Sequence, residues 1–489
     1  MNPTKMLMEV DVKDPRSADS PRTESTPAMI EVFRVEAPTV EPPAVEPAAK
    51  ELTTEAGENS LFHLEFFLRT FRKWFAKGGL AVVDYGLISG SNFLLGILLA
   101  RWLTPPEYGA YALAFSFFIL AGFLYQSLLL EPLSVFSGTL FRDNIRGYLK
   151  TTLSIHWALS LLMCLVLAVA AVLVFVVGHS PLLAIALSGM AIATPFLMAH
   201  ALARRSFYLK LMPGPAAFGS IFYCVFVTGG VFLFFRLGLL SSFTAFLVMG
   251  FAALVTSGVM VLQLNAALAP ATGRPGLRAT WGKHWEYGRW ALATCVVGWI
   301  PNYIYIPLVS SFSGMAAAGE LRALMNLAAP VLQTYAALSM LFLPYAARVQ
   351  HEKGRRGATM LSRRLAFLFV AGSAAYWAVL IPFKQPLFHF LYNGKYMESA
   401  YLIPLFALET TIWSASLGPA ILLRAMESPR SLFLANGAAS VIALVIGIPA
   451  TRYFGLQGVI FSMIGANALY VVVAFILFGR KLATVPRPE

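Results

Sequence analysis

Long uncharged apolar runs alternate with short polar connections from about residue 80 to the C-terminus. Each run has about 18 to 28 residues, the length at which an α-helix crosses the hydrocarbon core of a bilayer. Strands of a membrane barrel are about ten residues long and alternate polar with apolar positions, so the runs predict helices. We predict about twelve spans, at 80–100, 111–133, 151–177, 181–203, 216–236, 241–268, 288–311, 321–346, 364–383, 398–423, 431–450 and 456–478.

The pattern before the first run is different. Residues 1–60 are rich in Pro and hold twelve of the 24 Asp and Glu residues, and such a segment cannot bury enough apolar surface to fold. We predict a disordered acidic cytoplasmic tail at 1–60. Residues 61–79 mix bulky apolar side chains with four cations, which predicts a basic amphipathic interfacial helix in contact with anionic membrane lipids.

The net charge of +13 is explained by the distribution of Lys and Arg over the connections. If both termini are cytoplasmic, 25 Lys and Arg residues after the tail fall on the cytoplasmic side and 6 on the other. The positive-inside rule therefore predicts cytoplasmic N- and C-termini. Nucleic-acid binding is not expected, because these cations are dispersed over separate loops and form no folded basic domain.

The spans divide into two halves of six. We expect an N-terminal six-helix bundle at 80–269, a basic cytoplasmic linker at 270–287, a C-terminal six-helix bundle at 288–480 and a cytoplasmic tail at 481–489. A weak repeat with an offset of 210 aligns 103–118 with 313–328 and places Gly109 on Gly319. Because six is even, the halves share one orientation and are expected to be related by an axis along the membrane normal.

No catalytic chemistry is predicted. The sequence contains no phosphate-binding Gly-rich loop, no HExxH and no GxSxG motif, and the predicted external connections are too short for a catalytic domain. The three cysteines lie in separate apolar runs, which argues against a disulfide framework or a metal site. We expect no enzyme activity, no metal and no cofactor. His156 and His200 are interpreted as packing residues.

Polar side chains inside spans are the best candidates for a substrate cavity, because each is costly in hydrocarbon and faces protein or water. In span 8, an arginine and two amides recur at offsets of four and seven, on one helical stripe. The cavity candidates are Asp84, Ser91, Asn92, Gln126, Glu131, Arg322, Asn326 and Gln333. Two alternatives stay open: Asp84 and Glu131 pair with the basic joint Arg204 and Arg205, and Arg322 snorkels to the interface.

Glu409 lies near the middle of span 10, with no opposite charge in its own segment. An isolated carboxyl group there is expected to take up a proton or a cation, so Glu409 is a candidate for proton or sodium coupling. The alternative is a neutral acid whose hydrogen bonds hold helices together.

The connection between the first two spans carries a recognisable motif. Leu99, Ala100, Arg101, Leu103, Pro105, Glu107, Gly109, Tyr111 and Ala112 form the pattern. It resembles the polysaccharide and O-antigen flippases of the multidrug/oligosaccharidyl-lipid/polysaccharide exporter superfamily, and 201–218 is similar to that family's basic joint. The resemblance covers about 78–480 and leaves the acidic tail outside.

The resemblance implies an all-α integral membrane protein whose two bundles form the V-shaped MATE-like transporter fold. It implies transport of an undecaprenyl-diphosphate-linked glycan across the bacterial inner membrane, with a glycan polymerase or glycosyltransferases as partners. Three alternatives remain: a cation-coupled multidrug antiporter, a peptidoglycan-precursor flippase, and a membrane glycosyltransferase or polymerase.

Overall fold

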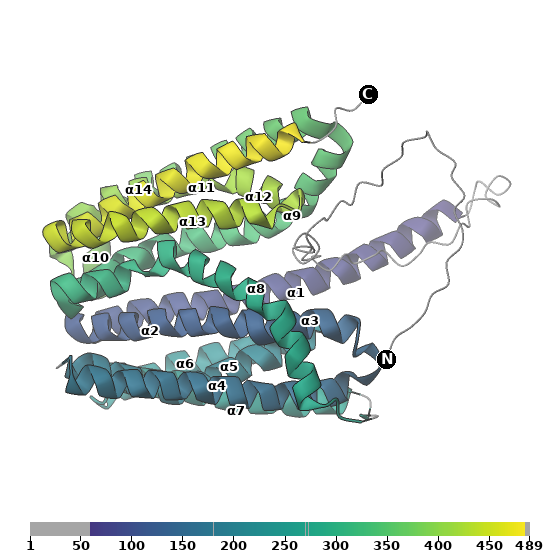
Figure 1. Cartoon of the computed structure of the whole chain (residues 1–489), viewed down its shortest axis with the longest axis horizontal. Helices are drawn as coiled ribbons and strands as arrows, with labels where there is room; N and C mark the ends of the chain where they lie inside the picture. Colours follow the sequence, from purple (N-terminus) through teal and green to yellow (C-terminus); the bar gives the residue numbers. More distant parts are fainter. Residues whose placement is uncertain (1–58, 179, 269, 272, 485–489) are drawn as a thin grey trace, which may run out of the picture. The chain divides into compact units, whose positions relative to one another are not determined.

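The computed structural model describes residues 59–484 except 179, 269 and 272, and within that range it describes only the backbone of 59–78, 81 and 267. The chain divides into residues 1–37 and 38–489, and everything described below belongs to the second unit. Every regular element of the described part is a helix (Figure 1). Of the predicted tail at 1–60, only residues 59–60 are described. Of the predicted tail at 481–489, only residues 481–484 are described.

The helices of the N-terminal half come first in Figure 1. They are α1 (Asn59–Trp102), α2 (Pro105–Tyr125), η2 (Gln126–Leu130), α3 (Glu131–Gly138), η3 (Arg142–Asn144), α4 (Ile145–Val176), α5 (Pro181–Tyr208), α6 (Pro213–Arg236) and α7 (Ser242–Ala267). Those of the C-terminal half are α8 (Leu277–Tyr303), α9 (Tyr305–Leu380), α10 (Lys384–Tyr392), η4 (Met397–Leu402), α11 (Ile403–Ala415), α12 (Leu417–Ala425), α13 (Pro429–Val445) and α14 (Gly447–Ala483).

The predicted membrane fold is confirmed. Nine described helical stretches are long and apolar enough to cross a membrane, and one of them, Leu277–Leu380, contains 104 residues. Non-helical backbone at Gly314 and Gly354 divides this long stretch into three passes, and Gly455 separates a further pass formed by α13 and the start of α14. Each glycine has a positive φ, which glycine adopts at little cost. The described chain therefore makes twelve passes, at the predicted places.

The turn between α1 and α2 shows how the sequence sets a helix boundary. Thr104 is the N-cap of α2, and it forms a capping box with Glu107, whose Oε2 accepts a hydrogen bond from Thr104 Oγ1 at 2.9 Å. Pro105 and Pro106 occupy the first helical positions, where their missing N–H groups cost nothing. Trp102, at the end of α1, stacks on Phe235 of α6 at 4.3 Å between ring centroids. These contacts fix the corner of the N-terminal half.

Small residues let the helices of each half pack closely, as expected where lipid supplies no hydrophobic driving force between helices. In the N-terminal half α5 packs against α7, and an added Cβ at Gly250 would lie 2.9 Å from the Cα of Ala193. In the C-terminal half α9 packs against α11, α12 and α14. Large apolar side chains on the outer surfaces are exposed, including Val172 and Phe367, which is the arrangement expected of lipid-facing positions.

The predicted linker 270–287 differs from the structure because α8 already begins at Leu277. His284 of this segment is buried against the N-terminal half: the Tyr148 hydroxyl lies 2.7 Å from its Nε2, and the Leu128 carbonyl lies 3.1 Å from its Nδ1. Residues 61–79, predicted to lie at the interface, continue directly into the first pass as one backbone helix. Their interfacial placement stays a prediction.

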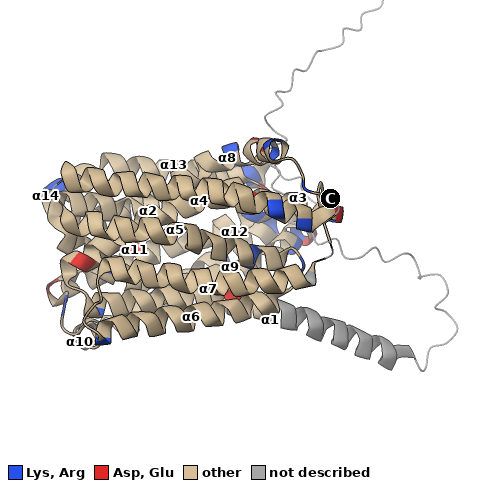
Figure 2. Cartoon of the chain, turned by 90° about the horizontal axis from the view of Figure 1, so that it is seen from below, with Lys and Arg blue, Asp and Glu red and all other residues tan. Residues whose placement is uncertain are grey.

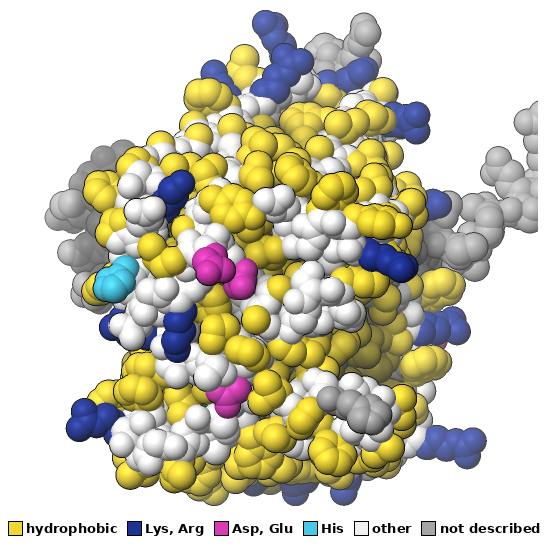
Figure 3. Space-filling model, turned by 90° about the vertical axis from the view of Figure 1, so that its left-hand side faces the viewer, with side chains coloured by type: hydrophobic (Ala, Val, Ile, Leu, Met, Phe, Trp, Pro, Cys, Tyr) yellow, Lys and Arg dark blue, Asp and Glu magenta, His cyan; other side chains and the backbone are white. Residues whose placement is uncertain are grey.

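The two ends of the bundle are named here by the helices that mark them. The "α10 end" carries the turns at 103–104 and 237–241 and the connection 381–396, and the "α3 end" carries the connections at 139–144 and 268–276 (Figure 1). Figure 2 shows Lys and Arg gathered toward the ends of the helices, with few between them. On the face of the α10 end seen in Figure 3, apolar and uncharged side chains predominate.

Candidate functional site

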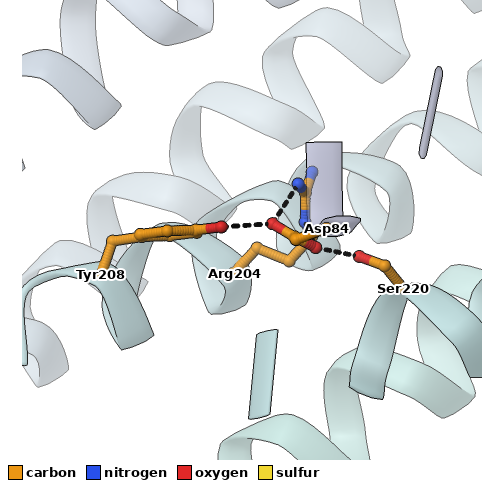
Figure 4. Close-up of polar contacts among 4 residues, drawn as sticks. All are labelled: Asp84, Arg204, Tyr208 and Ser220. Atoms are coloured by element: carbon orange, nitrogen blue, oxygen red, sulfur yellow. Dashed lines mark hydrogen bonds and ion pairs between the residues drawn. The ribbon is translucent and has the colours of Figure 1, made fainter. Parts of the chain in front are cut away.

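Asp84 is completely buried among three helices (Figure 4). Its Oδ2 accepts hydrogen bonds from Arg204 Nη2 at 2.7 Å and from the Tyr208 hydroxyl at 2.6 Å, and its Oδ1 accepts hydrogen bonds from Arg204 Nε at 3.3 Å and from Ser220 Oγ. These partners come from α5 and α6. Of the two alternatives for Asp84, pairing with Arg204 is the one that the structure shows, so this carboxylate ties α1 to α5 and α6 and does not face an open cavity.

Glu131 and Arg205 lie near each other but are not in contact as an ion pair within the described chain. Arg205 donates from Nε to Ser134 Oγ at 2.6 Å. Glu131, at the start of α3, interacts with the side chain of Gln126, and Arg205 supplies the nearby positive charge. The basic joint therefore contributes Arg204 to a buried ion pair and Arg205 to a weaker contact with α3.

A hollow of about 250 Å³ lies inside the N-terminal half, lined by side chains of α1, α2, α5, α6 and α7. Asn92, Gln126 and Arg204 line it, so two of the predicted cavity residues come together here. Ser91 was expected on the same side and is not: it is buried and donates to the carbonyl of Leu87 within its own helix. The helical period places Ser91 and Asn92 on neighbouring faces of α1. Which of these faces lines the hollow depends on the packing of the other helices.

His200 also lines this hollow. Its ring stacks on Tyr223 at 4.8 Å between centroids, and its Nε2 is buried without a hydrogen-bond partner in the described chain. His156 packs differently, with its Nδ1 lying 2.8 Å from the Tyr125 hydroxyl. Both histidines pack against aromatic residues, and the Nε2 of His156 is likewise buried without a hydrogen-bond partner in the described chain.

Arg322 lies where the two halves meet, at 5.6 Å from the centroid of the Phe115 ring of α2. Asn326, one turn further along α9, donates from Nδ2 to the Tyr108 hydroxyl at 2.8 Å. No carboxylate pairs with Arg322 among the described residues, whose ion pairs are Asp84–Arg204 and Arg348–Glu352, and its Nε is buried without a hydrogen-bond partner. The half-buried guanidinium therefore carries its charge at this junction without a carboxylate partner, and its side chain forms a hydrogen bond with Tyr108.

Tyrosines lie near this charge. Tyr111 belongs to the corner motif, but the sequence predicted no role beside Arg322 for it or for the other tyrosines. Tyr108 forms a side-chain hydrogen bond with Arg322, and Tyr111 and Tyr303 lie nearby. Tyr108, Tyr111 and Phe115 recur at offsets of three and four on one face of α2, which was the available signal. Gln333 was expected to extend the stripe, but it is exposed, two turns beyond the buried Asn326.

Glu409 is buried in a second hollow, of about 150 Å³, inside the C-terminal half. Its Oε1 accepts a hydrogen bond from Asn467 Nδ2 at 2.6 Å, and its Oε2 accepts one from Thr410 Oγ1 at 3.0 Å. Asn302 of α8 lines the same hollow. The described residues contain no cluster of three or more His, Cys, Asp and Glu side chains that could hold a metal. The oxygens of Glu409 and the two asparagines are instead ligands suited to a hard monovalent cation.

The halves touch at the α10 end through the two glycines aligned by the repeat. A Cβ added to Gly109 would lie 1.7 Å from the Met315 carbonyl oxygen, and one added to Gly319 would lie 2.6 Å from the Pro105 carbonyl oxygen. Repeat-equivalent residues meet each other only near a two-fold axis. The contact between Gly109 and Gly319 therefore agrees with a two-fold axis that relates the halves. A side chain larger than that of glycine does not fit at either position.

Lys395 links the two halves at the α10 end. Lys395, in the connection after α10, donates from Nζ to the carbonyls of Arg101 at 2.8 Å and Leu103 at 2.7 Å, at the C-terminus of α1. Arg101 in turn donates to the Phe390 carbonyl. Burial lowers the pKa of Lys395, while the Glu107 carboxylate acts in the opposite direction. The corner motif 99–112 therefore holds the C-terminal half as well as its own.

Toward the α3 end α9 presents several exposed side chains. Beyond Asn326, α9 exposes Gln333, Thr334, Met340 and Leu341. Figure 1 shows α13 and α14 diverging from α4 and α7 in this direction, with α8 crossing between them. The two halves are in direct contact at the α10 end, near Arg322. Toward the α3 end α8 links them, while α13 and α14 diverge from α4 and α7 (Figure 1).

Solved structures with the same fold are transporters. No protein-family model matches the chain, and no curated protein matches it by sequence. The chain is similar to the lipid II flippase MurJ in an inward closed conformation, with 13% identity, a TM-score of 0.63, and coverage of 83% of this chain and 89% of that one. It is similar to an inward-facing multidrug resistance MATE family transporter of the MOP superfamily, with 13% identity, a TM-score of 0.64, and coverage of 82% and 98%. For the MATE multidrug transporter DinF-BH the values are 15%, 0.57, and 82% and 93%. The chain therefore has the fold of these MOP superfamily transporters.

Proposed function

We propose that this protein is a flippase that moves an undecaprenyl-diphosphate-linked oligosaccharide from the cytoplasmic to the outer leaflet of a bacterial inner membrane. The observation that carries the proposal is Arg322, which has no carboxylate partner in the described chain and lies near the contact between the two halves, whose outer helices diverge toward the α3 end (Figure 1). The α10 end is then the outer side, and the α3 end, with both termini, faces the cytoplasm. Transport would proceed by alternating access, as one half rocks against the other.

The physical need for such a site is the substrate's head. A glycan diphosphate cannot cross hydrocarbon unaided, because burying its charges and unpaired hydroxyls costs many kcal/mol. Arg322 offers a planar guanidinium that binds phosphate oxygens in pairs, and the nearby half-buried Tyr303 offers a ring face to sugars. Tyr108 and Tyr111 are buried in this state and support Arg322 from behind. Asn92 and Gln126 add polar groups on the N-terminal half. The prenyl tail would stay in the bilayer throughout.

Arg322→Gln is expected to slow transport of the lipid-linked glycan roughly ten- to hundredfold, the loss of one charge-assisted contact. The measurement is the flipping of a fluorescent undecaprenyl-diphosphate-linked oligosaccharide in proteoliposomes. Arg452→Gln is the matched control, because Arg452 is an exposed arginine predicted on the same side. Unchanged flipping by Arg322→Gln would contradict the proposed role of this arginine.

We further propose that Glu409 couples transport to protons or sodium. Its hollow joins α8, α9, α11 and α14, so occupation by a cation would change contacts among four helices at once. Glu409→Gln keeps the shape and the hydrogen bond with the Asn467 side chain, and we expect normal folding with loss of ion-driven transport. Glu398→Gln, the same change at an exposed position, is the control. Ion-dependent transport that survives in Glu409→Gln would favour the alternative of a structural acid.

A cation-coupled multidrug antiporter is the second candidate, together with a peptidoglycan-precursor flippase. The hollow around Glu409 is small and bordered by Phe406 and Trp413, which suits an organic cation as well as an inorganic one. Transport of the lipid-linked glycan, of lipid II and of an organic cation dye, compared in the same proteoliposomes, separates the three. For the first candidate, glycosyltransferases and a glycan polymerase are the proposed partners, because the glycan must be built before transport and extended afterwards.

A further inference from the structure

A deep groove runs along the outside of the N-terminal half near the α3 end. Its volume is about 480 Å³, in the range of small-molecule sites, and its walls come from α4, α5 and α7. It continues into a second hollow of about 260 Å³ that shares Phe196 and Leu254 with it. None of the lining residues of either hollow belongs to the C-terminal half. The groove is therefore separate from the space between the halves.

Most of the groove is apolar and open to the surroundings. Trp157 of α4 is 40% exposed, and Leu254 and Leu262 of α7 are 44% and 72% exposed. In a membrane these side chains face lipid. From Asn265 to Leu254 the groove follows α7 for eleven residues, about 16 Å at the rise of an α-helix, which is roughly the depth of one leaflet.

The end of the groove nearest the α3 end is positively charged. Arg146 and Lys150, in the first two turns of α4, line it, and the Nε of Arg146 is buried without a hydrogen-bond partner in the described chain. Arg274 lies beside them, and its Nη2 donates hydrogen bonds to the Lys150 carbonyl and to Ser154 Oγ. Ser206, Ser257 and Asn265 are the uncharged polar residues of the lining, and no Asp or Glu is among its residues. The N-terminus of α4 adds its partial positive charge.

We propose that this groove binds one anionic glycerophospholipid of the surrounding bilayer. The lipid phosphate would lie at Arg146 and Lys150, and an acyl chain would lie along the apolar walls toward Phe196 and Leu254. The charge of the mouth complements an anionic head, and the groove's depth matches one leaflet. A prenyl carrier fits less well, since its much longer chain would leave most of its surface outside. The site does not depend on which substrate the protein transports.

The first test removes the charges. The full-length protein is purified in detergent, and its binding of phosphatidylglycerol is titrated by native mass spectrometry against phosphatidylcholine with the same acyl chains. Arg146→Gln with Lys150→Gln is expected to weaken phosphatidylglycerol binding roughly thirty-fold, at about a factor of five for each cation. The matched control is Arg142→Gln with Lys210→Gln, which removes two exposed cations from the same end without touching the groove. Equal losses in both double variants would overturn the proposal in favour of diffuse surface attraction.

The second test fills the groove and leaves every charge in place. Gly258 lines it, and an added Cβ there meets no atom within 4 Å, so Gly258→Phe is expected to fold normally and to exclude the acyl chain. We expect it to lose phosphatidylglycerol binding as fully as the charge variant. Binding at the wild-type level in Gly258→Phe would overturn the proposal, as would undecaprenyl phosphate displacing phosphatidylglycerol at equal concentration.

Discussion

Asp84→Ala is expected to lower the free energy of unfolding by about 3–5 kcal/mol, the usual result of leaving one partner of a buried ion pair alone. The side chain of Arg204 is 20% exposed and that of Asp84 only 1%, so water cannot replace the lost carboxylate without entering the helix packing. Tyr208 and Ser220 lose their acceptor as well. Three helices would therefore be loosened by one substitution.

Thermal unfolding of the purified protein, followed by intrinsic fluorescence, measures this effect. Asp84→Ala combined with Arg204→Ala should be less destabilised than the sum of the two single variants, because the second change removes the stranded charge. Asp143→Ala is the control, since Asp143 is exposed on a connection at the same end. Additive losses in the double variant would mean that the two charges do not stabilise each other.

Gly109→Ala is expected to prevent closure at the α10 end. Its new methyl carbon would lie 1.7 Å from the Met315 carbonyl oxygen, and a backbone atom cannot rotate away, so α2 and α9 must separate. A shift of about 5.5 kcal/mol is enough to change a two-state population from 1:99 to 99:1. We expect the outward-open state to dominate and transport to stop.

The readout is chemical access to the closed contact. Ala318, fully buried in α9 beside Gly319, is replaced by cysteine in a variant whose three native cysteines are alanine. Labelling by a membrane-impermeant maleimide from the outer side should rise at least about tenfold in Gly109→Ala, the factor expected from a shift of about 1.4 kcal/mol or more. Gly122→Ala on the same helix, where an added Cβ meets nothing within 4 Å, should leave labelling unchanged. Slow labelling together with normal transport in Gly109→Ala would contradict the role of the contact.

Hydrophobic run length predicts the passes of this protein well, because the bilayer imposes one strong rule on each segment. The break predicted between 311 and 321 falls at Gly314, and the one predicted between 450 and 456 falls at Gly455. The start of α8 was placed about ten residues late. Its first three turns contain Arg278, Lys283 and His284, and such polar residues are typical of a loop. In the structure His284 packs against Tyr148, and this segment is part of the helix.

The charged part of the candidate site could be predicted from the sequence, because a buried charge limits the choice of partners. A buried aspartate needs a cation, and the basic joint predicted at the same side of the membrane supplies two, so Arg204 or Arg205 could be proposed as the partner of Asp84 from chemistry alone. The neutral partner of Glu409 could not be predicted from the sequence. Asn467 lies 58 positions away, and nothing in the sequence distinguishes it from other amides. The tyrosines around Arg322 were hidden for a similar reason, since they belong to a chain with 18 Tyr and 38 Phe.

The position of α8 makes the two sides of the molecule unequal. His284, Cys295 and Trp299 fasten this helix to the N-terminal half, while the Val297 carbonyl accepts a hydrogen bond from Ser440 of α13. The flank beside α8 is thus spanned by a helix bound to both walls. On the opposite flank α1 rests mainly on α6, and the part of it nearest the α3 end exposes apolar side chains such as Val82 and Val83. A cargo tethered to the bilayer by a long hydrocarbon chain would therefore find the flank beside α8 closed, and its tether would have to pass elsewhere.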